Sequence, residues 1–144
     1  MTSTPSAPRD HFVLAGITSD AAFLGRLLAA LPDDGFGQVF VEGTGPSALR
    51  GWPGPAGISA HWVRQDLAPA RDGRLPGPGE VLADALRAWA AEWLPEPGFT
   101  GPLPYTVWIG GAGCPPVDEL CRDLLRDYPW LHLHHPTGVS ARER

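Results

Sequence analysis

The chain has 144 residues, of which 43% are hydrophobic and 19% charged, a composition typical of a globular domain with its own core. The formal net charge is -5, so there is no electrostatic reason to expect a nucleic-acid partner or binding to an anionic membrane. All 11 basic residues are arginine. This excludes a Schiff-base lysine, a P-loop lysine and a lysine general base.

The cysteines and the hydropathy predict a cytoplasmic setting. Cys114 and Cys121 lie seven residues apart near one predicted helix, about 10 Å apart along its axis, so we expect two reduced thiols rather than a disulfide. No apolar run approaches the ~20 residues of a membrane span. The first ten residues also lack the apolar stretch of a signal peptide.

The N-terminal part begins with residues 1–10, whose Ser, Thr and Pro predict a disordered leader. The apolar run Phe12–Gly16 predicts a buried strand. Ser19 and Asp20 each offer an N-cap to a following helix, which Pro32 ends. This helix is expected to bury one apolar stripe, consisting of Phe23, Leu24, Leu27, Leu28 and Leu31.

The middle of the chain contains two further strand candidates, Gln38–Glu42 and Ile58–Arg64. The Gly/Pro-rich connection between them allows one helical turn at Ser47–Arg50. The clearest helix is Glu80–Leu94, which Pro95 stops. Its inward seam is expected to be Leu82, Leu86, Trp89 and Trp93.

The C-terminal part predicts a strand at Tyr105–Ile109, a helix at Pro115–Asp127 and a short strand at Trp130–His134. Residues 137–144 are expected to form a flexible tail. The helix is expected to turn Val117, Leu120, Cys121, Leu124 and Leu125 inward.

Strands that alternate with helices predict the fold class. We expect one α/β domain over residues 11–136, with three layers and a five-stranded, mostly parallel sheet flanked by helices. At Pro104–Leu120 an apolar strand passes through a glycine-rich turn into a helix. Sheets of this class hold phosphates and cofactors at such joints.

Four segments carry a resemblance to a known family. They read FVLAGITSDAAFLGRLLAALP, QVFVEG, ISAHWVRQD and YTVWIGGAGCPPVDELCRDLLRD, and together they cover about Phe12 to His134. In order and spacing they resemble the C-terminal, NAD(P)H-binding domain of the siderophore-interacting proteins. These are FAD- and NAD(P)H-dependent ferric-siderophore reductases related to ferredoxin reductase. The resemblance implies the same nucleotide-binding fold.

The sequence departs from this family at its functional segments. The family's opening loop reads Gly-Asp-Glu-Thr, whereas here it is Gly16-Ile17-Thr18-Ser19. The later Ala-Gly-Glu loop is Gly-Gly-Ala-Gly-Cys, and the closing Tyr-Trp-Arg-Arg-Gly tail is replaced by HLHHPTG. The Arg-x-Tyr-Ser/Thr signature of the flavin-binding barrel does not occur. We therefore expect no bound FAD and no ferric-siderophore reduction by this chain alone.

The glycine-rich turn is the first candidate for a cofactor contact. Gly110, Gly111 and Gly113 would let a pyrophosphate of NADPH or NADH approach the backbone next to a helix N-terminus. Pro115 and Pro116 remove two of the N–H groups that a phosphate would use. The alternative is that the glycines only form a tight turn and that proline starts the helix.

Further cofactor candidates follow the other strands. The resemblance places Gly16, Thr18 and Ser19 near the nicotinamide or its phosphates, although either hydroxyl would also serve as a helix cap. Arg64 ends the third strand, where it would pair with an adenosine 2′-phosphate or, alternatively, with Asp66.

The resemblance also places Cys114 near the nicotinamide, and a helix N-terminus lowers the pKa of a thiol. The alternative is that Cys114 only caps the helix.

Two further features have alternative interpretations. His132 and His134 share a strand face and lie next to His135, which suggests either a metal site or a solvated strand end. Trp52 lies in a Gly/Pro loop, where it would contact a partner or fold back over the sheet.

Two functions are consistent with these features. The first is a stand-alone domain that binds NAD(P)H weakly and acts with a partner flavoprotein in siderophore or iron-related redox chemistry. The second is a non-catalytic interaction or scaffold domain that has lost nucleotide binding. A weaker third alternative is a small enzyme that uses Cys114. A protein partner is expected in the first two cases, and self-association is compatible with each.

Overall fold

The computed structural model describes residues 10–46, 52–101 and 103–136. The predicted leader, the predicted tail and the predicted turn at Ser47–Arg50 lie outside the described residues.

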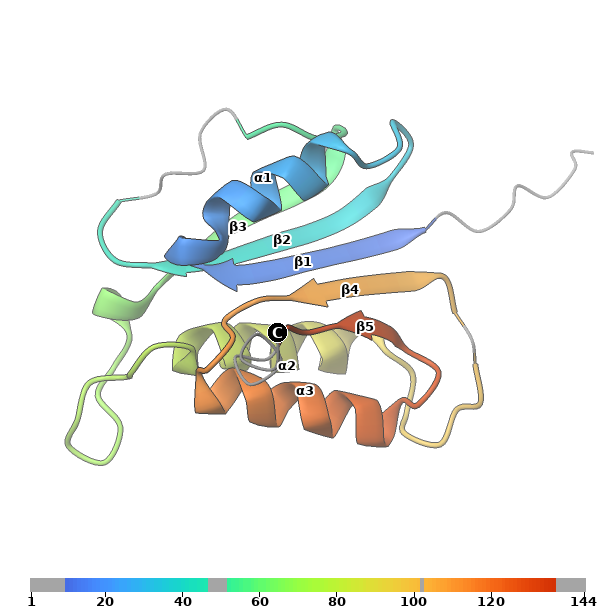
Figure 1. Ribbon diagram of the computed structural model, residues 1–144. Coiled ribbons are helices and arrows are strands. Elements are labelled where there is room, and N and C mark those ends of the chain that lie inside the picture. Colours follow the sequence, from blue (N-terminus) through green and yellow to red (C-terminus); the bar gives the residue numbers. More distant parts are fainter. Residues whose placement is uncertain (1–9, 47–51, 102, 137–144) are drawn as a thin grey trace, which may run out of the picture.

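One parallel sheet organises the described chain (Figure 1). The five strands are His11–Ile17 (β1), Phe36–Gly43 (β2), Gly57–Arg64 (β3), Tyr105–Ile109 (β4) and His132–His134 (β5). Their order is β3-β2-β1-β4-β5, and each neighbouring pair is parallel. The predicted α/β sheet is therefore confirmed. The last strand is shorter than predicted, because Trp130 and Leu131 precede it.

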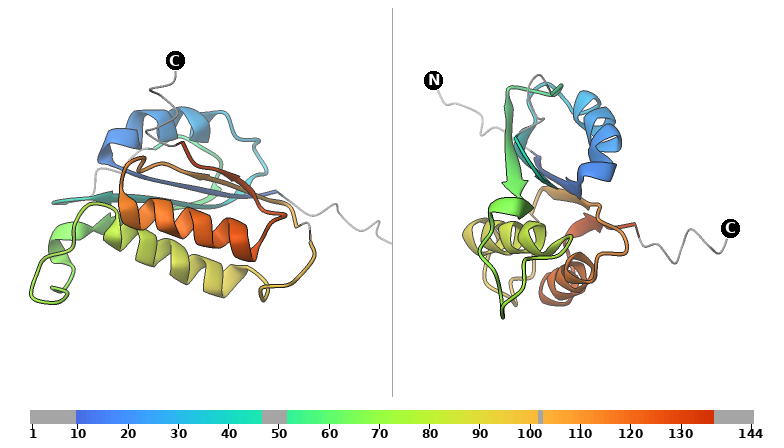
Figure 2. Two further views of the ribbon diagram at one scale, coloured as in Figure 1. Left: turned by 60° about the horizontal axis from the view of Figure 1, so that its bottom comes forward. Right: turned by 90° about the vertical axis from the view of Figure 1, so that its left-hand side faces the viewer.

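Helices cover both faces of the sheet, which gives the three predicted layers. Ala21–Ala29 (α1) follows the short 3-10 helix Thr18–Asp20 (η1) and lies on one face. Glu80–Trp93 (α2) and Pro115–Asp127 (α3) lie side by side on the opposite face (Figures 1 and 2). A second 3-10 helix, Gln65–Leu67 (η2), follows β3.

The alternation of side chains along the strands divides the core into two parts. On β1, Val13 and Ala15 pack against α2 and α3, whereas Leu14 packs on the α1 side. Trp52 is half-buried and packs on the α1 side as well, so it folds back over the sheet. The helices bury the apolar positions expected of them at the centre of each stripe, including Leu24, Leu28, Leu82, Leu86, Val117 and Leu120.

The prediction that Phe23, Trp93 and Leu125 lie in the core is wrong. Phe23 and Trp93 are each 40% exposed, and Leu125 is 41% exposed. A helix that lies on a sheet buries only the middle of its apolar stripe, and the residues at the margins remain partly in solvent. Phe23 partly compensates by packing against the Trp108 ring, with centroids 4.9 Å apart.

Candidate functional site

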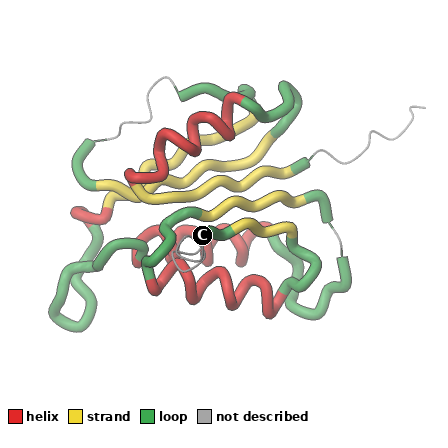
Figure 3. The backbone as a smooth tube through the Cα atoms, viewed as in Figure 1, coloured by secondary structure: helices red, strands yellow, loops and turns green. Residues whose placement is uncertain are grey.

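The sheet order places two loops together at one edge of the sheet. The chain moves from β1 outward to β2 and β3, and then returns across the sheet to β4, so the order reverses between β1 and β4. In open α/β sheets the ligand crevice lies at this point, outside the carboxyl ends of the strands. The loops after β1 and β4 lie at the same end of the sheet (Figure 3). They bring the predicted residues Gly16, Gly110 and Gly111 together.

A carboxylate of the chain itself lies at this switch point. Asp20 Oδ2 accepts the backbone N–H of Ile17, the last residue of β1, at 2.9 Å. The same oxygen accepts the backbone N–H of Gly111, after β4, at 2.9 Å. These are the kind of loop amides that would otherwise bind a phosphate oxygen. Asp20 therefore pairs two backbone amides from opposite sides of the switch point.

Gly16 and Gly110 leave the space that the Asp20 side chain occupies. A Cβ atom on Gly16 would lie 2.7 Å from the Asp20 Cβ, and a Cβ atom on Gly110 would lie 2.6 Å from Asp20 Oδ2. Real Cβ atoms do not approach other atoms so closely. In this structure Gly16 and Gly110 therefore make room for a side chain of the protein.

Asp20 was interpreted from the sequence only as a helix cap. It does occupy the N-cap position of α1, but its side chain makes no capping bond to that helix. The sequence carries a weak signal for the observed role, since an acid three residues after Ile17 can accept that residue's N–H. The second bond, to Gly111, depends on the strand order and could not be foreseen from local pattern.

A second carboxylate, that of Glu42 on β2, also accepts two backbone N–H groups. Glu42 is only 3% exposed, and its two oxygens accept the backbone N–H groups of Gly79 at 2.8 Å and Leu82 at 2.9 Å. It thereby caps α2 from the sheet. Gly79 has a φ of +87°, and a Cβ atom there would lie 2.8 Å from the Cβ of Cys114.

Cys114 lies in an acidic, buried environment. It precedes α3 at the N-cap position without making a side-chain cap bond, and it is 8% exposed. Burial raises the pKa of its thiol, and the charges of Glu42, Asp118 and Asp20 raise that pKa further. These effects act opposite to the lowering expected from the helix N-terminus.

Both cysteines are free and buried, as expected from their spacing. Burial raises the pKa of Cys121 to about 12.

His135 ties the segment after β5 to the glycine-rich turn. Its Nδ1 lies 2.7 Å from the carbonyl oxygen of Ile109, and its Nε2 lies 2.6 Å from Oδ1 of Asp118. Both neighbouring oxygens are hydrogen-bond acceptors. His135 therefore bridges the end of β4 and the first turn of α3.

The remaining predicted cofactor residues lie apart from one another. Thr18 and Ser19 are exposed on η1, beside the crevice. Arg64 ends β3. Because β2 lies between β3 and β1, Arg64 is about 10 Å from β1 across the sheet. Its NH2 group lies 2.6 Å from Asp66 Oδ2, the alternative pairing named above, and this bond lowers the pKa of Asp66 to about 2. Gly113 is exposed at a φ of +87°, consistent with a turn position that favours glycine.

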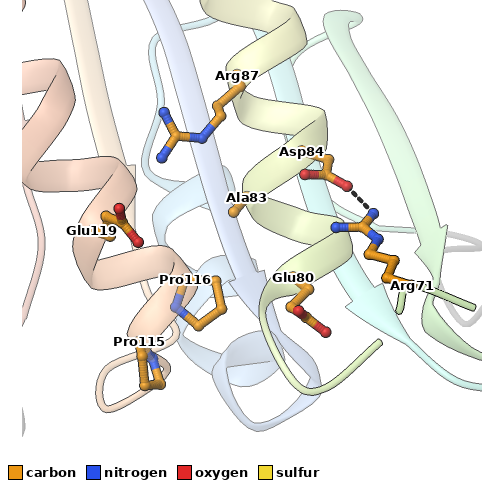
Figure 4. Close-up of a pocket in the computed structure, with 8 residues that line it drawn as sticks. All are labelled: Arg71, Glu80, Ala83, Asp84, Arg87, Pro115, Pro116 and Glu119. Carbon is orange, nitrogen blue, oxygen red and sulfur yellow. Dashed lines mark hydrogen bonds and ion pairs between the residues drawn. The ribbon is translucent and has the colours of Figure 1, made fainter. Parts of the chain in front are cut away.

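A separate cavity of about 310 Å³ lies between the first turns of α2 and α3 (Figure 4). Its two arginines are already paired, Arg71 with Asp84 and Arg87 with Asp123. Glu80 and Glu119 add negative charge, and Pro115 and Pro116 offer no N–H group. This cavity is therefore unsuited to a phosphate.

Metal-binding side chains are sparse. Within the described ranges no group of three or more His, Cys, Asp or Glu side chains has a metal-binding arrangement. His132 and His134 do lie together, with their Nε2 atoms 2.8 Å apart. No helix among the described residues is long and apolar enough to span a bilayer.

These features define a doubly wound α/β domain with a five-stranded parallel sheet, in which the Asp20 carboxylate lies at the switch point. Solved structures with a similar fold include a siderophore utilization protein from T. fusca, with a TM-score of 0.59 and 20% identity over 92% of this chain. The siderophore-interacting protein SipS from Aeromonas hydrophila gives a TM-score of 0.53 and 17% identity over 91% of this chain. The siderophore-interacting protein from Acinetobacter baumannii gives a TM-score of 0.56 and 11% identity over 94% of this chain.

The resemblance seen in the sequence is thus confirmed at the level of the fold. The chain spans about half the length of these structures, since it covers 46%, 54% and 50% of them. No protein-family model matches the sequence, and no curated protein matches it significantly.

Proposed function

We propose that this domain is a siderophore-interacting-protein-like module that acts through contact with a protein partner, in siderophore or iron-related redox chemistry, and does not itself bind NAD(P)H. The observation that carries the proposal is the Asp20 carboxylate on the N–H groups of Ile17 and Gly111. A pyrophosphate at this point would have to displace Asp20 and lie close to a second negative charge on Glu42. Both requirements oppose binding of an anion.

The siderophore context in this proposal comes from the names of the similar structures, and its redox context comes from the family resemblance of the sequence. Hydride transfer requires a nicotinamide and an acceptor cofactor. The Ile17 and Gly111 amides at the switch point already donate to Asp20. Cys114 is not proposed as a nucleophile, because burial and the nearby carboxylates favour its neutral thiol. We expect a partner to contact the parts of the sheet that no described helix covers.

Titration of the full chain with NADPH, followed by calorimetry, tests the proposal. We expect no saturable binding below about 1 mM for the native chain. We expect Asp20→Ala to gain measurable binding, because it frees both amides and removes a charge. The control Asp34→Ala removes an exposed acid from the turn before β2 and should leave binding undetectable.

The second candidate function is weak NAD(P)H binding together with a partner flavoprotein. Thr18, Ser19 and Arg64 favour it, because all three follow strands at the carboxyl edge of the sheet. This candidate would replace the first if the native chain bound NADPH saturably below about 1 mM and if Arg64→Ala weakened that binding. Retention of a flavoprotein from a lysate of the source organism would add the partner that this candidate requires.

A further inference from the structure

The last strand presents two imidazoles on an open face of the sheet. His132 and His134 are two residues apart on β5, so their side chains project to the same side. Leu133, between them, packs into the core beneath α2 and α3. The two histidines therefore lie on the α1 side, where α1 covers the other end of the sheet and no helix of the described ranges lies over β5 (Figure 2). Both are exposed.

The two rings converge through their Nε2 atoms. These atoms are 2.8 Å apart, and the ring centroids are 4.6 Å apart. Two neutral imidazoles can share one proton across such a distance, and a metal ion can replace that proton by accepting both lone pairs. Neutral imidazole is a common ligand for divalent zinc, copper and nickel.

The separation of the nitrogens distinguishes between coordination geometries. With metal–nitrogen bonds of about 2.0 Å, nitrogens 2.8 Å apart subtend about 90° at the metal. This is the angle between neighbouring ligands in square-planar and octahedral complexes. A tetrahedral ion would require the nitrogens to lie about 3.3 Å apart. Square-planar or tetragonal sites are typical of Cu²⁺ and Ni²⁺, whereas protein-bound Zn²⁺ prefers tetrahedral sites.

We propose that His132 and His134 form a two-nitrogen chelate for a divalent first-row metal ion of tetragonal preference, with Cu²⁺ bound most tightly and Ni²⁺ bound more tightly than Zn²⁺. The next residue, His135, is held by Ile109 and Asp118 and does not contribute. Water completes the coordination, because no third ligand from the described residues joins the pair. The site is distinct from the crevice and does not depend on the proposed function.

Trp108 provides a local reporter for this site. It is paired with His134 in the β4–β5 ladder and projects to the same face of the sheet. A paramagnetic Cu²⁺ ion bound to His134 would quench the fluorescence of the Trp108 indole, which lies on the neighbouring strand. Trp108→Phe should therefore remove much of the Cu²⁺-dependent quenching, while calorimetry still detects one bound ion.

The experiment is a calorimetric and fluorescence titration of the full chain with Cu²⁺, Ni²⁺ and Zn²⁺ as the metal alone. We expect one Cu²⁺ per chain. His132→Ala and His134→Ala should each lower Cu²⁺ affinity on the order of 100-fold, because a chelate becomes a single ligand. The matched control is His61→Ala, which removes another exposed strand histidine, on β3, and should leave the affinity unchanged.

Three results would overturn the proposal. The first is an unchanged Cu²⁺ affinity in the double variant His132→Ala/His134→Ala, which would place the metal elsewhere. The second is tighter binding of Zn²⁺ than of Ni²⁺, which would contradict the inferred angle. The third is a full loss of binding in His61→Ala. Because both ligands are exposed, the alanine variants should keep the native circular dichroism spectrum, which separates loss of the site from loss of the fold.

Discussion

At the scale of single residues, two carboxylates shape the edge of the sheet where a ligand would bind. Asp20 and Glu42 each accept two backbone N–H groups, and each joins segments that are distant in the sequence. Buried N–H groups must be paired, and a side-chain carboxylate pairs them as effectively as a bound anion. These bonds therefore stabilise the fold.

Because Asp20 packs between Gly16 and Gly110, we expect substitutions at Asp20 and Gly110 to be energetically coupled. Gly110→Ala should destabilise the protein by about 1–3 kcal/mol, because the new methyl group meets the Asp20 carboxylate. In an Asp20→Ala background the same change should cost clearly less, giving a coupling energy of about 0.5–3 kcal/mol. Urea denaturation of the four proteins in this cycle measures the coupling.

Gly25→Ala is the matched control for this cycle. Gly25 lies within α1, and nothing lies within 4 Å of a Cβ atom placed there. Alanine should therefore stabilise the helix by up to about 1 kcal/mol, equally with or without Asp20. Additive costs for Gly110→Ala and Asp20→Ala would refute the inferred contact.

A buried histidine predicts a dependence of stability on pH. His11 is 2% exposed, and its Nε2 donates to Gln38 Oε1 at 2.8 Å. Burial lowers its pKa from the ordinary value of 6.5, against a smaller opposing effect of the bond to Gln38. The unfolded chain therefore binds the proton at higher pH than the folded chain does. The contribution of His11 to stability is fully present above pH 6.5 and decreases as the pH falls below it.

His11→Phe removes this titration. Denaturation at pH about 7.5 and about 5.5 should show a larger loss of unfolding free energy on acidification in the native chain than in the variant. Equal losses in the two proteins would show that His11 does not carry the effect.

At the scale of elements, the helices were predictable because their stripes repeat every three to four residues and their ends carry proline or acidic residues. The bounds of α3 match the expectation, and those of α2 differ only at Leu94. What the pattern did not predict is how far around each helix the core extends. That depends on where the helix lies on the sheet, and for this reason Trp93 and Leu125 are partly exposed.

This difference between centre and margin has a measurable energetic consequence. Leu82 is 0% exposed at the centre of α2, so Leu82→Ala should cost about 2–5 kcal/mol of unfolding free energy. Leu125 is 41% exposed on α3, so Leu125→Ala should cost less than about 1 kcal/mol. The midpoints of urea denaturation measure both. Similar losses at the two positions would contradict the arrangement of α3 on the sheet.

At the scale of the whole molecule, the sequence was sufficient to predict the layers, the alternation of strands and helices and the family resemblance. It also placed Gly110 and Gly111 on the loop that follows β4, whereas Gly16, expected in the opening loop, lies within β1. It could not predict what occupies the space between those loops, because Gly111 and Asp20 meet only through the order of the strands. The paired state of Arg64 was foreseeable, since Asp66 is two residues away, and was named as an alternative.

The position of β1 at the centre of the sheet affects how the chain is made. During synthesis β1, β2 and β3 leave the ribosome before β4 and can associate, but the other side of β1 has no partner until residues 105–109 emerge. A nascent intermediate with a bare, apolar strand edge is prone to join other chains. We therefore expect folding of this domain to depend on chaperones or on slow translation.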